Sequence, residues 1–106
     1  METETFSFKT EDGVNISAYK WLPDNKSNIK GVVQISHGMA EHAVRYENFA
    51  GALTKAGYTV YANDHRGHGK TAGSLDNVGY FASNNGWDLV VSDMYELNKI
   101  ISNNHP

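Results

Sequence analysis

Residues with reactive side chains are concentrated in two short segments, HGMAEH at residues 37–42 and DHRGHGKT at residues 64–71. In the first segment, Gly38 allows a sharp turn and lets a backbone N–H approach a ligand closely. The imidazole of His37 can hydrogen-bond to nearby backbone and fix the shape of the turn. Backbone N–H groups held in this way can stabilise an oxyanion during acyl transfer. A strand-to-helix turn without any function could have the same composition. Both a loop that stabilises an oxyanion and a purely structural turn therefore remain open at this point.

The histidines of the two segments raise the question of a metal site, because His37, His42, His65 and His68 would be neighbours if the segments meet. The i, i+3 spacing of His65 and His68 lies in a glycine-rich turn, where it defines no common face. No matching cluster of carboxylates accompanies them. The run GHGKT lacks the first glycine of a phosphate-binding loop, since Asp64 occupies that position. We therefore expect neither a metal nor a cofactor.

Charged residues in both segments favour local ion pairs. Glu41 and Arg45 are four residues apart with the glutamate first, a spacing that contributes about 0.2–0.5 kcal/mol on a helix. For Glu41 we favour this pair, which would order the loop, over a role as general base. Asp64 and Arg66 are expected to pair with each other or to brace the neighbouring loop.

Hydrophobic periodicity predicts the elements that position these segments. Alternating residues at 4–10 and 14–21 around Asp12-Gly13 predict an antiparallel hairpin, because Asp-Gly supplies the positive φ of a tight turn. The runs GVVQIS (31–36) and YTVYAN (58–63) are typical of strands covered on both faces. Apolar residues at helical spacing predict two helices: Tyr46, Phe49, Ala50 and Leu53 in one that stops at Gly57, and Trp87, Val90, Val91, Met94, Leu97 and Ile101 in one that stops before Asn104.

This order of elements predicts an α/β fold, in which an antiparallel N-terminal hairpin joins a parallel pair of strands with two flanking helices. The carboxyl ends of strands 31–36 and 58–63 would meet at one edge of the sheet, where ligands bind in such folds. Both reactive segments directly follow these strands, so we expect them side by side. The pattern calls for a further strand after the last helix.

Composition narrows the range of functions. The 106 residues suit one domain, and a net charge of −3 without a block of Lys or Arg argues against nucleic acid as a partner. The absence of cysteine excludes disulfides, thiolate metal sites and a cysteine nucleophile. No apolar run approaches the roughly 18 residues of a membrane span, and the N-terminus lacks a signal-peptide pattern. We therefore expect a cytoplasmic protein.

The two segments together carry a more specific pattern, H-G-x-x-E-H-x-x-R-Y followed by a helix and by a strand that ends in D-H-x-G-H-G-x-[ST]. This pattern resembles the N-terminal part of monoacylglycerol-lipase-like and lysophospholipase-like serine hydrolases of the α/β-hydrolase superfamily. The resemblance implies that HGMAEH is the oxyanion loop and that the backbone N–H of Met39 donates one oxyanion hydrogen bond. It implies a structural role for DHRGHGKT, and a loop-shaping role for His37, Gly38, Glu41, His42 and Arg45.

The catalytic serine of this family lies in a G-x-S-x-G elbow. None of the ten glycines opens such an elbow, and neither Ser36 nor Ser74 has the required neighbours. The resemblance therefore implies a single partial α/β-hydrolase domain over residues 1–106, which ends before the elbow and is inactive alone. The full protein would hydrolyse an ester or lipid-like small molecule.

The resemblance also implies the strand order first-second-fourth-third in the sheet. The strand at 31–36 would then form an open apolar edge, which invites self-association or pairing with a partner chain. This gives an alternative hypothesis, a non-catalytic α/β binding module that pairs through its open sheet edge.

Overall fold

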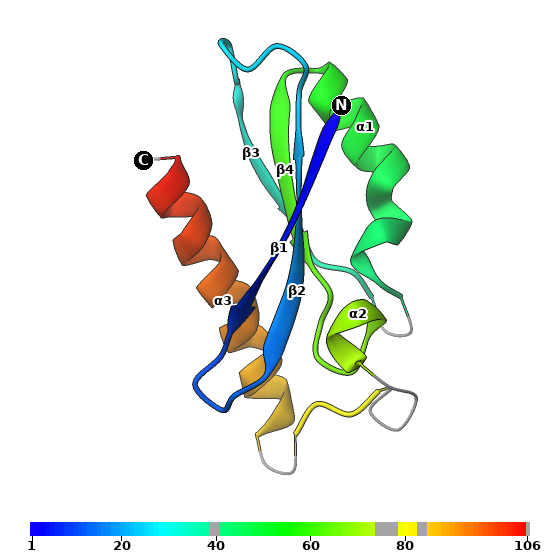
Figure 1. The fold of residues 1–106 in the computed structure, drawn as a ribbon, viewed down its shortest axis with the longest axis vertical. Coiled ribbons are helices and arrows are strands. Elements are labelled where there is room, and N and C mark those ends of the chain that lie inside the picture. The colour runs from blue at the N-terminus through cyan, green and yellow to red at the C-terminus, as the bar shows by residue number, and fades with distance from the viewer. Residues whose placement is uncertain (39–40, 74–78, 83–84, 106) are drawn as a thin grey trace.

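The computed structural model of the chain describes residues 1–38, 41–73, 79–82 and 85–105. A four-stranded sheet has the order β1-β2-β4-β3, which confirms the predicted strand order (Figure 1). The elements along the chain are β1 Glu2–Lys9, β2 Asn15–Leu22, β3 Gly31–Ile35, the 3-10 helix η1 Ala43–Tyr46, α1 Glu47–Lys55, β4 Tyr58–Asn63, α2 Gly69–Ala72 and α3 Gly86–Asn104.

The predicted hairpin is present as the antiparallel pair β1–β2, in which Phe8 lies opposite Ile16. Its turn closes through a hydrogen bond from the Thr10 N–H to the Val14 carbonyl oxygen, 2.9 Å long. Gly13 has a φ of +85°, a conformation that favours glycine. The Asp-Gly pair therefore marks the turn correctly.

The parallel pair β3–β4 is the part of the sheet that positions both reactive segments. The two strands run in register from Gly31 opposite Tyr58 to Ile35 opposite Ala62. The strand β4 is buried almost throughout, as predicted, because it has neighbours on both sides. The strand β3 is mostly half-buried, although Val33 packs against the apolar cluster on one face of the sheet and Val32 against the cluster on the other. The reason for the half-burial is its place at the sheet edge, where it pairs with β4 alone among the described strands.

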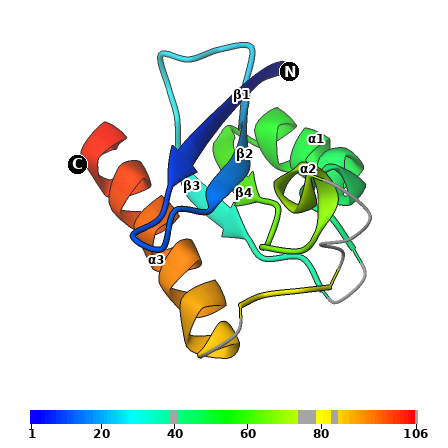
Figure 2. The same cartoon turned by 60° about the horizontal axis from the view of Figure 1, so that its bottom comes forward.

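Helices cover both faces of the sheet, and Figure 2 shows α1 and α3 on opposite sides of it. The side chains of β4 alternate between two apolar clusters, as the period of a strand requires. The cluster on the α1 side contains Tyr19, Trp21, Ile35, Ala43, Ala50, Val60 and Ala62. The cluster on the α3 side contains Ala18, Tyr61, Leu97 and Ile101, with Phe6, Phe8 and Val32 packed against it.

The predicted apolar stripes of the two helices are only partly correct. Phe49 in α1 is 56% exposed, and Trp87 and Val91 in α3 are 71% and 43% exposed. The buried face of α3 instead includes Asp93, which is 1% exposed. An ion pair described below compensates the buried carboxylate, and the buried face of α3 consists of Val90, Asp93, Leu97 and Ile101. None of the described helices combines the length and apolar character that crossing a membrane requires.

Substitution of Gly69 tests how tightly the segment after β4 is packed. A Cβ at Gly69 would lie 2.5 Å from the Asp64 carboxyl carbon, whereas a Cβ at Gly73 would meet no atom within 4 Å. Both glycines have positive φ, so Gly73→Ala isolates the backbone strain. We expect Gly73→Ala to lower the free energy of unfolding by about 1 kcal/mol and Gly69→Ala by about 2–4 kcal/mol, because overpacking adds to the strain. Equal losses in urea unfolding would contradict this packing.

Candidate functional site: two loops at the carboxyl edge of the sheet

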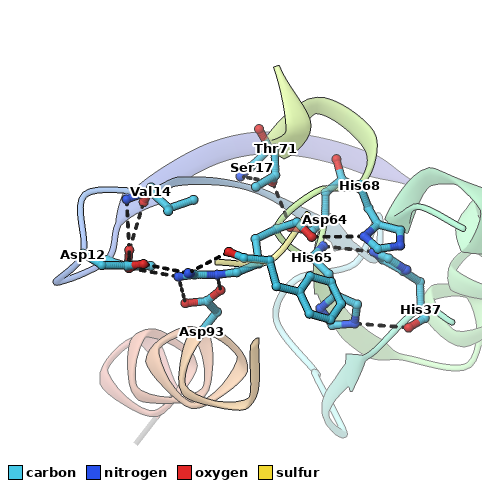
Figure 3. A network of polar contacts seen from close by, with 12 residues as sticks. Asp12, Val14, Ser17, His37, Asp64, His65, His68, Thr71 and Asp93 are labelled. Carbon is cyan, nitrogen blue, oxygen red and sulfur yellow. Dashed lines mark hydrogen bonds and ion pairs between the residues drawn. The ribbon is translucent and has the colours of Figure 1, made fainter. Parts of the chain in front are cut away.

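The two reactive segments meet where β3 and β4 end. We call the described residues 36–38 and 41–42 the β3 loop, and residues 64–68 the β4 loop. The backbone N–H of His65 donates to Nε2 of His37 over 2.9 Å, and Nε2 of His65 lies 3.1 Å from the His37 carbonyl oxygen. The two rings are 4.1 Å apart, and Figure 3 shows them side by side with His68. The prediction that the segments lie next to each other is therefore correct.

The hydrogen bonds assign a tautomer to each of the two rings. Nε2 of His37 accepts from a backbone N–H, so its proton is on Nδ1, which donates to the Gly38 carbonyl oxygen over 2.7 Å. Nε2 of His65 faces a carbonyl oxygen, so this atom carries the proton. Burial lowers the pKa of both histidines, that of His65 to about 4. Both rings are therefore neutral near neutral pH.

Ser36 lies close enough to His65 to raise the question of a serine–histidine pair. Its hydroxyl oxygen is 3.0 Å from Nε2 of His65. That nitrogen already carries the proton it donates to the His37 carbonyl oxygen, so it cannot remove the serine proton. Nδ1 of His65 is buried without a hydrogen-bond partner among the described residues, so no carboxylate orients the ring. Ser36 is consequently not activated as a nucleophile.

The carboxylate of Glu41 organises the β3 loop. Its Oε1 accepts from the Gly38 N–H and from the Tyr46 hydroxyl, each over 2.7 Å, and these bonds lower the pKa of Glu41. Its Oε2 pairs with Arg45 over 3.0 Å. The predicted ion pair is present, although Glu41 precedes η1 and the two residues do not share one helix. The Gly38 N–H is thereby occupied, so it has no free hydrogen for a ligand.

One predicted loop residue, His42, remains outside this bonded cluster. His42 is exposed and caps η1 in an extended conformation, and no ring contact joins it to the other histidines in the described ranges. Met39, whose N–H is the expected oxyanion donor, lies outside the described residues, as does Ser74.

Asp64 joins the β4 loop to three other parts of the fold. Its carboxylate accepts from the Tyr19 hydroxyl over 2.9 Å, from the Ala43 N–H over 2.8 Å and from the Lys70 N–H over 3.1 Å. Burial and the nearby carboxylate raise the pKa of Tyr19 to about 12. Of the two expectations for Asp64, bracing the neighbouring segment is therefore confirmed and pairing with Arg66 is not.

Arg66 is buried and lies between two carboxylates. It makes paired hydrogen bonds to Asp93 of 2.7 and 2.9 Å and to Asp12 of 2.7 and 3.0 Å. The guanidinium holds the pKa of Asp12 well below its usual range, whereas burial raises the pKa of Asp93. Asp93 was missed in the sequence, although an acid between Val90 and Leu97 at helical spacing is a signal for a buried ion pair.

The described residues contain no group of three or more His, Cys, Asp or Glu side chains that could hold a metal ion. The rings of His37, His65 and His68 do lie together, with centroids 4.1 to 6.4 Å apart. However, Nδ1 and Nε2 of His37 and Nε2 of His65 are already committed to backbone atoms. These bonds therefore fix the two loops, and Nδ1 of His65 is left buried without a partner among the described residues.

Solved structures place this arrangement in a known fold class. A carboxyl esterase from Bacillus coagulans superimposes with a TM-score of 0.87 at 33% identity, covering 100% of this chain and 34% of that chain. A lipase in an open form gives 0.78 at 34% identity, covering 92% and 31%. A monoglyceride lipase from Saccharomyces cerevisiae, 19% identical over 91% of this chain and 31% of its own, shares the fold with a TM-score of 0.72. The fold is that of the N-terminal part of an α/β-hydrolase.

Sequence comparison then identifies the family. The family model described as serine aminopeptidase, S33, matches residues 27–106, and the chain belongs to this family. A monoacylglycerol lipase from Mycolicibacterium smegmatis is 39% identical over 100 residues, which are 94% of this chain and 33% of that protein. Human monoglyceride lipase is 37% identical over 62 residues, 58% of this chain and 20% of its own. The chain thus spans about a third or less of the length of these curated relatives.

Removing the Asp64 carboxylate tests whether the site depends on it. In Asp64→Ala, three donors lose their acceptor in a buried place, and we expect the free energy of unfolding to fall by about 3–5 kcal/mol. Tyr19→Phe removes one donor and should lose only about 1 kcal/mol. Asp24→Ala, at a carboxylate 88% exposed, is the matched control and should change stability by less than about 0.5 kcal/mol. Urea unfolding with similar losses for both aspartate variants would contradict this role.

Proposed function

We propose that the chain supplies the oxyanion loop of a carboxylic-ester hydrolase of the monoglyceride-lipase type. The observation that carries this proposal is the occupied Gly38 N–H, which Glu41 holds at 2.7 Å. Because that N–H is occupied, we assign the bond to the developing oxyanion to the next N–H along the chain, that of Met39. The relatives named as monoacylglycerol and monoglyceride lipases support a glycerol monoester or a similar lipid ester as the substrate class.

The chemistry of such a hydrolase passes through an acyl-serine intermediate, and water then releases the acid. In both steps negative charge develops on the carbonyl oxygen, and donors that are already in place stabilise it most. The bonds that His37 and Glu41 make would hold the β3 loop in one shape, so little reorganisation would accompany the reaction. The nucleophile, acid and base have no match within these 106 residues, so we propose that the chain alone is inactive.

The alternative, a binding module that pairs through the edge of β3, is supported by a second observation. Gln34 on β3 hydrogen-bonds to the Met94 carbonyl oxygen over 3.0 Å and receives a 3.2 Å bond from Asn98, so α3 lies beside this edge. One helical turn before these two residues, Val91 and Tyr95 are exposed, and Trp87 extends the same stripe. The edge of β3 that is unpaired among the described strands and the exposed apolar side chains of α3 favour binding of a partner segment.

The function can be tested by transplanting this chain. Residues 1–106 would replace the structurally matching third of the Bacillus coagulans carboxyl esterase, which retains its own nucleophile. We expect this chimera to hydrolyse p-nitrophenyl esters and to react with a fluorophosphonate, because the transplanted loop completes the site. Glu41→Ala in the chimera should lower kcat by about 10–100-fold with little change in KM, since it frees the loop that holds an oxyanion donor.

Glu47→Ala is the matched control for this experiment, because Glu47 is an exposed carboxylate in the first turn of α1. Its kcat should equal that of the unmodified chimera. The chain alone should neither hydrolyse the ester nor become labelled. A folded but inactive chimera, or fluorophosphonate labelling of Ser36 in the isolated chain, would overturn the proposal.

Association through the β3 edge can be measured by light scattering over a range of concentrations. We expect the chain alone to form dimers or larger species as its concentration rises, because the edge is unpaired. The double variant Trp87→Ser, Tyr95→Ser should weaken this association, whereas Phe49→Ser, at a similarly exposed residue on the opposite face, should not. A monomer at every concentration would argue against the binding-module alternative.

A further inference from the structure

We infer that His37 and His65 form an acid-sensitive clamp that holds the β3 loop against the β4 loop and releases it when the rings become protonated. The two residues make reciprocal bonds, one from the His65 N–H to the His37 ring and one from the His65 ring to the His37 carbonyl oxygen. Figure 3 shows the two residues next to each other, with dashed lines marking the contacts between them. We refer to this pair as the histidine clamp.

Protonation of His37 removes an acceptor that the clamp requires. In the neutral ring, Nε2 is the only acceptor, and it receives the His65 N–H over 2.9 Å. The imidazolium has an N–H at both nitrogens, so two donors would face each other at this position. The ring is buried, with 4% of its surface exposed, and water cannot easily replace the lost partner. The bond from the His65 N–H is therefore lost when His37 is charged.

Protonation of His65 also opposes the clamp, for a different reason. Its Nδ1 is buried and has no partner among the described residues, so a proton added there finds no acceptor. The ring centroids of His65 and His37 are only 4.1 Å apart, so two positive charges would repel each other strongly. Charging of either ring thus disfavours the closed arrangement, and charging of both disfavours it further.

The charged groups around the clamp do not reverse this effect. Asp64, at the end of β4, favours the charged form of both rings, and Glu41, in the β3 loop, favours that of His37. His68 in the β4 loop disfavours the charged form of both rings. Both carboxylates are occupied by other donors, namely those on Tyr19, Ala43 and Lys70 for Asp64 and those on Gly38, Arg45 and Tyr46 for Glu41. The guanidinium of Arg66 is held by Asp12 and Asp93. Burial is the largest influence on both rings and lowers the pKa of each.

The direction of the pH dependence follows from these lowered pKa values. In the released loop each histidine has its ordinary pKa of about 6.5, so the released state binds more protons than the clamped state. The clamp therefore weakens as the pH falls from about 6.5 toward the pKa of about 4 of His65. Release would loosen the bond from His37 to the Gly38 carbonyl oxygen. A loss of catalysis in acid would follow from this, and that consequence depends on the proposed function.

Amide hydrogen exchange with NMR tests the clamp on the chain itself without any ester. We expect the His65 amide to lose protection by about tenfold or more between about pH 6.5 and pH 4, after correction for intrinsic exchange, while amides within β4 stay protected. His37→Gln supplies an Oε1 acceptor that does not titrate, so the His65 amide should lose clearly less protection in acid than in the wild type, with only the titration of His65 itself remaining. His42→Gln, at an exposed histidine of the same loop, should keep the wild-type loss of protection.

Protection of the His65 amide that is independent of pH, or that is lost together with the β4 amides, would overturn the clamp. The ¹⁵N shifts of the wild-type rings give a second test that needs no variant. Near neutral pH they should show the proton on Nδ1 of His37 and on Nε2 of His65, and the opposite tautomers would also overturn it. An inactive chimera would contradict the proposed function and leave these measurements unaffected, so the two failures are distinguishable.

Discussion

A fully buried carboxylate, that of Asp64, accepts hydrogen bonds from segments that are distant in the sequence, β2, the start of η1 and the start of α2. An ionised carboxylate without donors would be very unfavourable in such a place. The three donors must therefore remain around it, which fixes the beginning of η1 and hence the β3 loop before it. The geometry of the candidate oxyanion loop thus depends on a residue of the neighbouring loop.

The β4 loop connects both helical layers to the sheet. Asp64 binds the backbone at the start of η1, which leads into α1, and Arg66, two residues later, binds Asp93 in the middle of α3. The same guanidinium hydrogen-bonds to Asp12 in the hairpin turn, so it joins the β4 loop, α3 and the hairpin. This arrangement gives the charged residues Asp64 and Arg66 of DHRGHGKT a structural role, because their contacts hold the helices in place. The histidine clamp uses the same loop to hold the β3 loop.

Much of the fold could be predicted because its signals are local. The Asp-Gly turn, the two β-branched runs and the helix ending at Gly57 depend on neighbours within a few residues. The strand order followed from the family resemblance and is correct. The buried faces of the helices were harder to predict, because an apolar stripe does not show which of its residues contact the sheet. Phe49 and Trp87 are apolar yet exposed, whereas Asp93 is charged yet buried.

The sequence by itself determined the two loop motifs, their place after parallel strands, and the lack of a G-x-S-x-G elbow in these residues. Only the tertiary structure decided what the polar residues do. Arg66 finds its partners 27 and 54 positions away, and the ring of His37 finds the backbone of His65 28 positions away. Desolvation and hydrogen-bond partners set the charge state of a side chain. Both depend on packing between distant segments, which local sequence patterns do not encode.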